Sequence, residues 1–512
     1  MQDSTPILVG AGQFTEFGVA PKQAQPPMGI ATEATKAALV DTGIAAVLAQ
    51  QIDTVIAIRS FSDSTNRPRL QIPFGRADNP PRAISRRIGA NPANAIYGNV
   101  GGNTPQKYIN EVAERISERD IGVALITGSE AIKTAQRAMR DGIELNWEEH
   151  DEGSLEDRGL GEKLMTPHEF AHGIGVPVQT YPLFENALRA QRGLSLDQHR
   201  LQLGRLFAPF TEIAAANPFA FYGTRRSAEE LATVTAANRY ICFPYPKWMN
   251  AMDGVNQGAA VIMTSVGKAR ELGIAPARWV FLHGCGEANE KLMVTNRVDY
   301  VSVPALRLNA KQALAMAGKT IDDMGYFDLY SCFPAAVELA CDALDLAYDD
   351  PRGLTVTGGL PFFGGPGNNY SLHGIATLLP LLRANPTHFG LVTANGGYLS
   401  KHATGIYSAT PLAGKWRREK TSSYQAEIDK MRSPSFTETP AGDASIETYT
   451  VCFNKGVPER GIVIGRLQGT GQRFVANTPA HGELLQAMVE TEQIGRPGTV
   501  ASNAGINTFV PS

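Results

Sequence analysis

The sequence is poor in cysteine and lacks the features of secreted or membrane-spanning proteins. Five cysteines occur in 512 residues, and none forms a Cys-x-x-Cys pair or a regular framework spacing. Such usage is typical of reduced thiols in the cytosol rather than of a disulfide scaffold. There is neither a basic-then-apolar signal peptide nor an uninterrupted apolar run of about 18 residues. We therefore expect a cytoplasmic protein without a membrane span.

A strong charge of one sign is also missing. The chain carries 47 Lys and Arg against 50 Asp and Glu, which gives a net charge of −3. This balance argues against a general polyanion-binding surface, so we predict no nucleic-acid partner. The glycine run at 358–367 contains no Gly-x-Gly-x-x-Gly fingerprint, and no Walker loop occurs. The common nucleotide-binding motifs are therefore absent.

The chain does contain the same order of elements twice, which its length and 43% hydrophobic content allow. In the first half, apolar spacing predicts a helix over 30–38, a strand over 55–58, a glycine turn over 99–103, a helix beginning with Thr104 as N-cap, and a strand over 123–126. The second half repeats it, with a helix over 310–317, a strand over 326–330, a glycine turn over 364–369, a helix over 375–382 and a strand over 391–393. This order predicts a duplicated α/β core with helices on both faces of its sheets.

Two further segments differ from this core. Residues 131–250 form a helical insertion of the kind that serves as a lid or binding subdomain, and it contains an acidic stretch over 148–156. Strand-forming runs over 446–453, 461–467 and 473–476 predict a small antiparallel, OB-like β-barrel. We therefore divide the chain into a first half over 1–270 that includes the insertion, a second half over 271–417, a linker over 418–439 and a C-terminal domain over 440–512.

Four motifs resemble those of one enzyme family. The segment DGVNQGAAVIMT over 253–264 resembles the Asp-Gly-Ala-Ala strand entry of thiolases. Residues 328–333, DLYSCF, are similar to the Glu-Leu-His-Asp-Cys-Phe segment of sterol-carrier-protein-type thiolases, 358–370 to their Gly-His-Pro loop, and 395–397 to their late glycine loop. The resemblance to the thiolase superfamily covers about 7–407. The β-rich tail further resembles the type 1 thiolase-like proteins.

The resemblance implies a layered αβαβα fold, a coenzyme A thioester as substrate or ligand, no covalently bound cofactor, no metal and a homodimer. A thiolase needs a nucleophilic cysteine and acid/base groups. The positions that match them hold Val100 or its neighbour Gly101, Tyr330, Gly365, and Asn395 or its neighbour Ala394. Acyl transfer through Val100 is chemically excluded, and we expect that Val100→Cys alone restores no activity.

Whether the protein is a catalyst stays open at this point. On or just after the matched loops lie three candidates for relocated chemistry, with Cys332 as thiol and His402 or His373 as base. Each has a simpler interpretation as a packed or hydrogen-bonded structural residue. The candidate coenzyme A contacts are the loop residues Asn368, Asn369, Gly396 and Gly397 and the insertion's Arg225 and Arg226.

Two other functions remain open. In a noncatalytic acyl-CoA-binding or scaffold protein, a partner would bind the C-terminal domain or the arginines of the segment 59–87, which also fit a solvated loop. A zinc hydrolase is suggested by His168 and His172, one helical turn apart with Glu169 between them. Gly173 ends that helix early, and no third ligand follows at a telling spacing.

Overall fold

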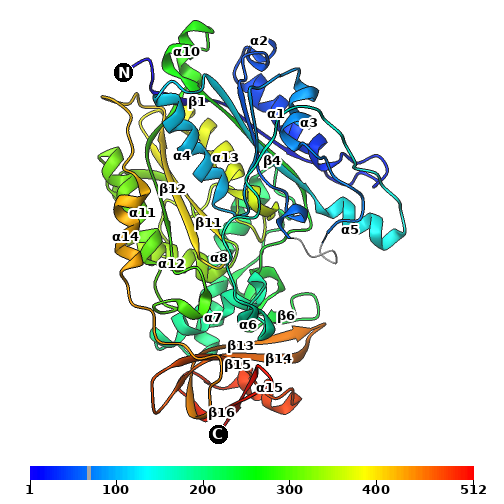
Figure 1. Ribbon diagram of the computed structural model, residues 1–512, viewed down its shortest axis with the longest axis vertical. Coiled ribbons are helices and arrows are strands. Elements are labelled where there is room, and N and C mark those ends of the chain that lie inside the picture. The colour runs from blue at the N-terminus through cyan, green and yellow to red at the C-terminus, as the bar shows by residue number, and fades with distance from the viewer. Residues whose placement is uncertain (66–70) are drawn as a thin grey trace.

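The computed structural model describes residues 1–65 and 71–512, in which a duplicated α/β core stands above a C-terminal β domain (Figure 1). The core is built on a ten-stranded sheet with the order β10-β11-β12-β9-β1-β8-β4-β2-β3-β5. These strands are β1 (Pro6–Thr15), β2 (Thr54–Ala57), β3 (Asn94–Tyr97), β4 (Val123–Ala131), β5 (Glu156–Asp157), β8 (Asn256–Ser265), β9 (Val280–Asn289), β10 (Met324–Asp328), β11 (Phe389–Gly396) and β12 (Lys401–Ser408). The short β1–β9 pairing joins the two halves.

Helices form three layers around this sheet. The inner pair, α4 (Thr104–Ser117) and α13 (Tyr370–Ala384), contacts strands of both halves. The outer helices of the first half are α1 (Pro27–Asp41), α2 (Ala45–Ala49), α3 (Pro80–Ile88) and α10 (Val266–Glu271), and those of the second are α11 (Pro304–Ala317), α12 (Pro334–Leu344) and α14 (Thr421–Asp429). The predicted αβαβα arrangement is confirmed. One apolar core lies around α4 and α13, and others lie beneath the outer layers.

Both halves use the same packing device. The first strand of each half has two glycines spaced two residues apart, so both face the same outer helix. A β-carbon at Gly12 of β1 would collide with the Ala34 carbonyl of α1, and one at Gly284 of β9 would collide with the Ala313 carbonyl of α11. The duplication therefore extends to the contact between the first strand and the first helix.

The insertion contains α5 (Ile132–Asp141), α6 (Pro167–Ala171), α7 (Pro177–Gln191), α8 (Leu196–Ala216), α9 (Ala228–Ala232), β6 (Tyr240–Cys242) and β7 (Tyr245–Pro246). Its largest helices pack against α12 and the second half, and their side chains share a core with it. The segment 418–439, interpreted as a linker, contains α14, whose Tyr424 and Ile428 are buried against the core. This segment therefore packs against the core and also connects the core to the C-terminal domain.

The C-terminal strands pair in a closed circuit, as expected of a small barrel. The strands β13 (Gly442–Asn454), β14 (Val457–Leu467), β15 (Arg473–Asn477), β17 (Ile506–Pro511) and β16 (Pro497–Asn503) follow one another around it, and α15 (Gly482–Glu490) lies between β15 and β16. The prediction of a wholly antiparallel barrel is wrong in one pairing, because β15 and β17 are parallel. Asn186 and Arg189 of α7 hold the domain through Tyr449 and Glu492.

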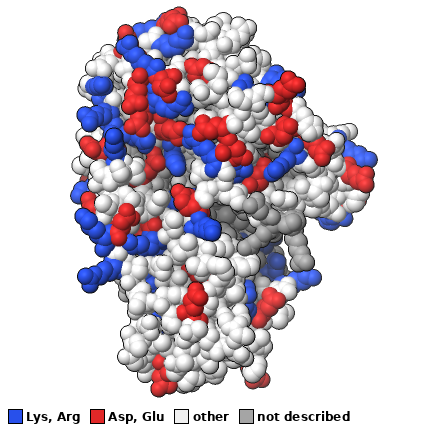
Figure 2. All heavy atoms as spheres, viewed as in Figure 1, with Lys and Arg blue, Asp and Glu red and all other residues white. Residues whose placement is uncertain are grey.

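Within the described ranges, no helix combines the length and apolar character that a bilayer crossing requires. On the face shown in Figure 2, acidic and basic side chains are interspersed rather than gathered by sign.

Candidate functional site

The turn at 99–103 connects β3 to α4 through a tight backbone path. Gly101 has φ 149°, which favours glycine, and its N–H donates to Asn368 Oδ1 at 3.0 Å. Asn103 is the N-cap of α4, one residue before the predicted Thr104, whose hydroxyl instead donates to the Gly101 carbonyl. Val100 is half-buried at this turn.

Two other loops meet this turn. A β-carbon at Gly102 would strike the Tyr330 hydroxyl and the Asn395 carbonyl. One at Gly396 would strike Asn103 Oδ1. Three of the four positions matched to catalytic residues, Val100, Tyr330 and Asn395, therefore converge. Gly365 lies in the loop that supplies Asn368, and its N–H donates to the Met252 carbonyl at 2.9 Å.

Cys332 lies in this convergence but is not activated. Its Sγ is 4.0 Å from Asn395 Nδ2, which also donates to the Tyr181 hydroxyl at 2.8 Å. Burial raises the pKa of Cys332 to about 12, so the thiol is protonated at neutral pH. The protonated thiol is the less reactive form, and within the described part of the chain no cationic group lowers the pKa of this thiol.

His402 faces away from the turn. Side chains alternate along β12: Tyr407 donates to Gln106 of α4, whereas Thr404 contacts Asn309 of α11. His402 shares the face of Thr404, and its Nε2 lies 3.1 Å from the Leu399 carbonyl. Burial lowers the pKa of His402 to about 3, so the ring is a weak base. The structure does not bring it to Val100.

Lys401, on the opposite face of β12, does reach the turn. Its Nζ donates to the Val100 carbonyl at 2.8 Å and pairs with Glu162 Oε2 at 3.3 Å. The residue is only 2% exposed, and desolvation lowers its pKa. Interpretation of the sequence overlooked this lysine. Side chains alternate along β12, so residues 401 and 402 face opposite sides of the sheet. Once the helix that packs on each side is known, this alternation identifies Lys401 as the residue that faces the turn.

His373 lies deeper on α13. Its Nδ1 is 2.8 Å from Gln13 Oε1, its Nε2 has no partner among the described residues, and burial lowers its pKa to about 3. Gln13 also donates to Thr377 at 3.0 Å, and both line an open groove of about 480 Å³ between β1, α8 and α13. His373 is therefore linked through Gln13 to the floor of this groove rather than to the turn at Val100.

The predicted coenzyme A contacts fall into two groups. Asn368 binds three partners of the turn region, Gly101, Arg59 and Ser64, while Asn369 donates to the Gly128 carbonyl at 2.7 Å. Gly396 packs against the turn and Gly397 accepts from Tyr181. Arg225 and Arg226 lie apart, on the insertion: Arg225 pairs with Glu212 at the surface, and Arg226 stacks over Trp248 at 3.5 Å.

Four of the five described arginines in this segment pair with nearby acids, and the fifth, Arg82, donates to Ser154 and Asn91. Arg86 and Arg87 pair with Glu149, Arg86 also pairs with Asp151, and Arg59 pairs with Asp157. These acids lie in or beside the acidic stretch of the insertion. Arg67 and Arg69 lie outside the described residues. The described arginines are therefore occupied rather than held free for phosphates.

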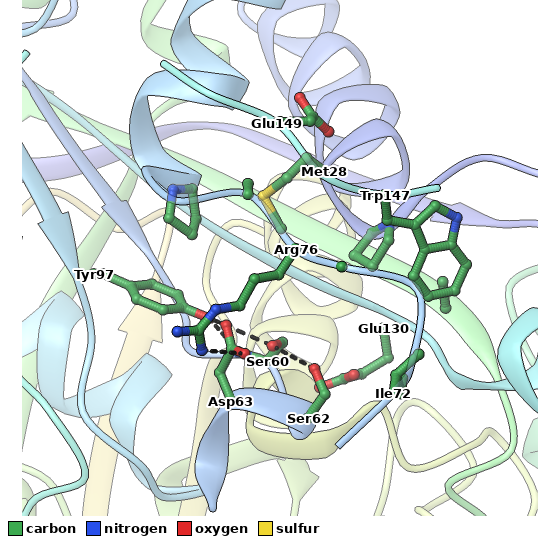
Figure 3. Close-up of a pocket in the computed structure, with 15 residues that line it drawn as sticks. Met28, Ser60, Ser62, Asp63, Ile72, Arg76, Tyr97, Glu130, Trp147 and Glu149 are labelled. Carbon is green, nitrogen blue, oxygen red and sulfur yellow. Dashed lines mark hydrogen bonds and ion pairs between the residues drawn. The ribbon is translucent and has the colours of Figure 1, made fainter. Parts of the chain in front are cut away.

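A small cavity lies beside this segment (Figure 3). At its centre Asp63 accepts from Arg76 at 3.0 Å and from the Tyr97 hydroxyl at 2.7 Å. Burial raises the pKa of Glu130, at its edge, to about 8. The cavity volume is about 30 Å³, which holds roughly two waters. It is too small for a thioester.

The zinc pattern forms a structural network. The Nδ1 of His172 bonds to the His168 carbonyl at 2.8 Å and its Nε2 accepts from the Asn507 N–H at 2.8 Å, so both ring nitrogens are engaged. Glu169 completes a capping box with the N-cap Thr166, whose N–H its side chain accepts, and it also accepts from Thr295. These contacts fasten α6 to the C-terminal domain.

A second cluster has the donor types of a metal site. Glu185, His199 and Glu338 place one ligand atom each within 4.8 Å of one another, and all three are buried. The same atoms also form a hydrogen-bonded network: His199 lies 2.8 Å from Glu185, and Arg192 donates to Glu338 at 2.8 Å. The guanidinium already supplies positive charge to these carboxylates, so a cation is not needed to balance them.

Comparison with known proteins identifies a matching family model and a similar crystal structure. The family described as thiolase-like protein type 1 additional C-terminal domain matches residues 423–504. A crystal structure of a monomeric SCP2-thiolase like protein type 1 from Mycobacterium smegmatis is 40% identical, with a TM-score of 0.84 and 100% of each chain covered. No curated protein matches the sequence.

Two more distant structures share the fold of the core. An Ltp2-ChsH2(DUF35) aldolase is 17% identical, with a TM-score of 0.57 over 80% of this chain and 99% of that one. An acetyl-CoA acetyltransferase from Syntrophomonas wolfei is 15% identical, with a TM-score of 0.52 over 80% of this chain and 100% of that one. At these identities the likeness concerns the fold alone.

Proposed function

The chain belongs to the SCP2-thiolase-like proteins of type 1, and from this premise we propose that it binds acyl thioesters of coenzyme A without acyl transfer through a cysteine. One observation carries the proposal. The loops around Val100, Tyr330 and Asn395 still meet at a glycine turn, although no side chain at these positions is a thiol or an imidazole. The frame of a thioester site is retained and its usual chemistry is not.

Unpaired polar atoms around the turn support a ligand site. The side-chain carbonyls of Asn103 and Asn395 are buried and have no hydrogen-bond partner in the described part of the chain. An unpaired buried carbonyl costs about 1–3 kcal/mol, so a ligand that supplies an N–H or O–H donor regains that energy. The amides of a pantetheine arm are such donors. Asn368 and Gly396 would hold the walls of this site.

Calorimetry with acetyl-CoA, acetoacetyl-CoA and free coenzyme A tests the proposal. We expect saturable binding of a thioester by the full-length protein, with no thiolysis when coenzyme A is added to acetoacetyl-CoA. Gly102→Ala should weaken binding at least tenfold, because its β-carbon displaces Tyr330 and the 395 backbone. Gly469→Ala is the matched control, since a β-carbon there meets open space. The absence of binding by all three ligands would refute the proposal.

A scaffold role for the C-terminal domain is the second candidate. Ile506 and Val510 both face outward from β17, at 44% and 48% exposure. Exposed aliphatic side chains on a strand suit contact with another protein. Affinity capture by the full-length protein and by an Ile506→Asp, Val510→Asp variant tests this role. Equal capture by the full-length protein and the variant would show that these two residues do not bind the partner.

A further inference from the structure

The residue at the turn with nucleophilic potential is a lysine. Lys401 extends from β12 to the backbone of Val100, and its Nζ and Cε lie 3.2 and 3.3 Å from the position of a β-carbon at Gly101. The ε-amine therefore borders the place where a side chain on this turn would begin. The positions matched by resemblance are 100, 330, 365 and 395, and they do not include this lysine.

The surroundings of Lys401 suit an amine that reacts with a carbonyl group. The charged groups that act on its ammonium are Glu162, which favours protonation, and Lys107, which opposes it. Desolvation outweighs the carboxylate, and the pKa of Lys401 is lowered from its ordinary value. A desolvated lysine is a recognised nucleophile toward ketones. The Glu162 side chain is 42% exposed, so the amine lies just beneath the surface.

Other groups at the turn fit this role less well. The thiol of Cys332 is protonated, since burial raises its pKa to about 12. Burial also raises the pKa of the Tyr330 hydroxyl. His402 shares the strand with Lys401 but points to the α11 layer. The amine of Lys401 and the unpaired side-chain carbonyl of Asn103 border the same position, both within 3.2 Å of a β-carbon at Gly101.

We propose that Lys401 forms an imine with the ketone of a 3-oxoacyl thioester held at this turn. The inference rests on the proposed function, because it needs a thioester site there. The neutral amine attacks the ketone carbon, a C–N bond forms and the oxygen takes up a proton. The carbinolamine then loses its C–O bond and one water, and an imine remains. No electrons are gained or lost overall, and the thioester bond stays intact.

Asn103 has a place in this step. Its unpaired carbonyl oxygen can accept a hydrogen bond, which the carbinolamine hydroxyl or an amide of the thioester can donate. Reaction at the thioester carbonyl would instead release coenzyme A and leave a stable amide on the lysine. A reversible imine is the product that allows the amine to be used again.

Reductive trapping tests the inference. Full-length protein is incubated with acetoacetyl-CoA and sodium cyanoborohydride, whose hydride converts an imine into a secondary amine. Peptide mass spectrometry should find a single adduct at Lys401. Lys401→Arg and Lys401→Met should lose it, and Lys107→Arg should keep it, since that variant preserves the neighbouring charge. Thermal melting confirms that each variant is folded.

Parallel calorimetry separates the two proposals. Thioester binding without a Lys401 adduct would overturn the imine and leave the proposed function standing. An adduct that persists in Lys401→Met, or one spread over surface lysines, would also overturn it. If no thioester binds, the proposed function fails and the imine fails with it. The expected result is saturable thioester binding by the wild type, with an adduct that Lys107→Arg keeps and that Lys401→Met and Lys401→Arg lose completely.

Discussion

The glycine loops that open α4 and α13 occupy equivalent places in the two halves but expose different residues. The first presents the half-buried Val100 beside Lys401, whereas the second is buried and inserts Asn368 into the first. Both loops keep the framework, and the amine of Lys401 lies beside the first of them. The duplication thus preserves architecture while chemistry differs between halves.

Equivalence of the two halves is tested most severely at the strand glycines. Gly12→Ala and Gly284→Ala each force a β-carbon into a helix backbone, which cannot yield as a flexible side chain would. We expect a loss of about 3 kcal/mol in each case, at the upper end of overpacking effects. Urea unfolding measures it against Gly469→Ala. A change below about 0.5 kcal/mol in one half alone would break the equivalence.

Acidification compares two buried histidines in the second half. The folded-state pKa of both His373 and His402 is lowered to about 3 from the ordinary 6.5. Their neutral forms stabilise the fold above pH 6.5, and that stability is lost as pH falls from 6.5 toward 3. Each contributes a slope of about 1.4 kcal/mol per pH unit. Unfolding between pH 6 and 5 should show a smaller slope in His373→Gln and in His402→Gln. An unchanged slope in both would contradict these pKa shifts.

The link between the loops is tested at Asn368. Asn368→Ala removes the acceptor for Gly101 and the donor to Arg59 and Ser64. We expect about 1–3 kcal/mol of lost stability and weaker thioester binding. Asn385→Ala is the control, because Asn385 also bonds through its amide but lies near the end of α13. Equal losses of binding would mean that the link does not shape the site.

The smallest expected effect is that of Val100→Cys. A thiol at 100 lacks the imidazole partners that Tyr330 and Gly365 replace, so a thiolysis assay should stay at background. Recovery of turnover by this single change would show that the residue at position 100 alone accounts for the missing thiolysis activity.

Local patterns predicted most elements of both halves, because helices and buried strands are encoded by spacing within a few turns. α1, α4 and α13 fall where apolar periodicity placed them, and β2 and β11 lie over the predicted runs. The predictions differ from the structure at the ends of strands: β4 continues to Ala131, and β10 stops at Asp328 rather than at Tyr330.

Long-range placement is what the sequence did not reveal. The pairing of arginines near 59–87 with acids near 149–157 joins residues that lie 62 to 98 positions apart in the chain. Likewise, the choice between Lys401 and His402 depends on which face of β12 meets α4. One residue of register exchanges the two. The composition of the strand gives no clue to that face.

Titration calorimetry of the full-length wild type with acetoacetyl-CoA tests the central claim most directly. A thioester site without cysteine chemistry predicts saturable binding at one ligand per chain, with intact thioester recovered afterward. No binding heat, or release of free coenzyme A with an acylated protein, would contradict it.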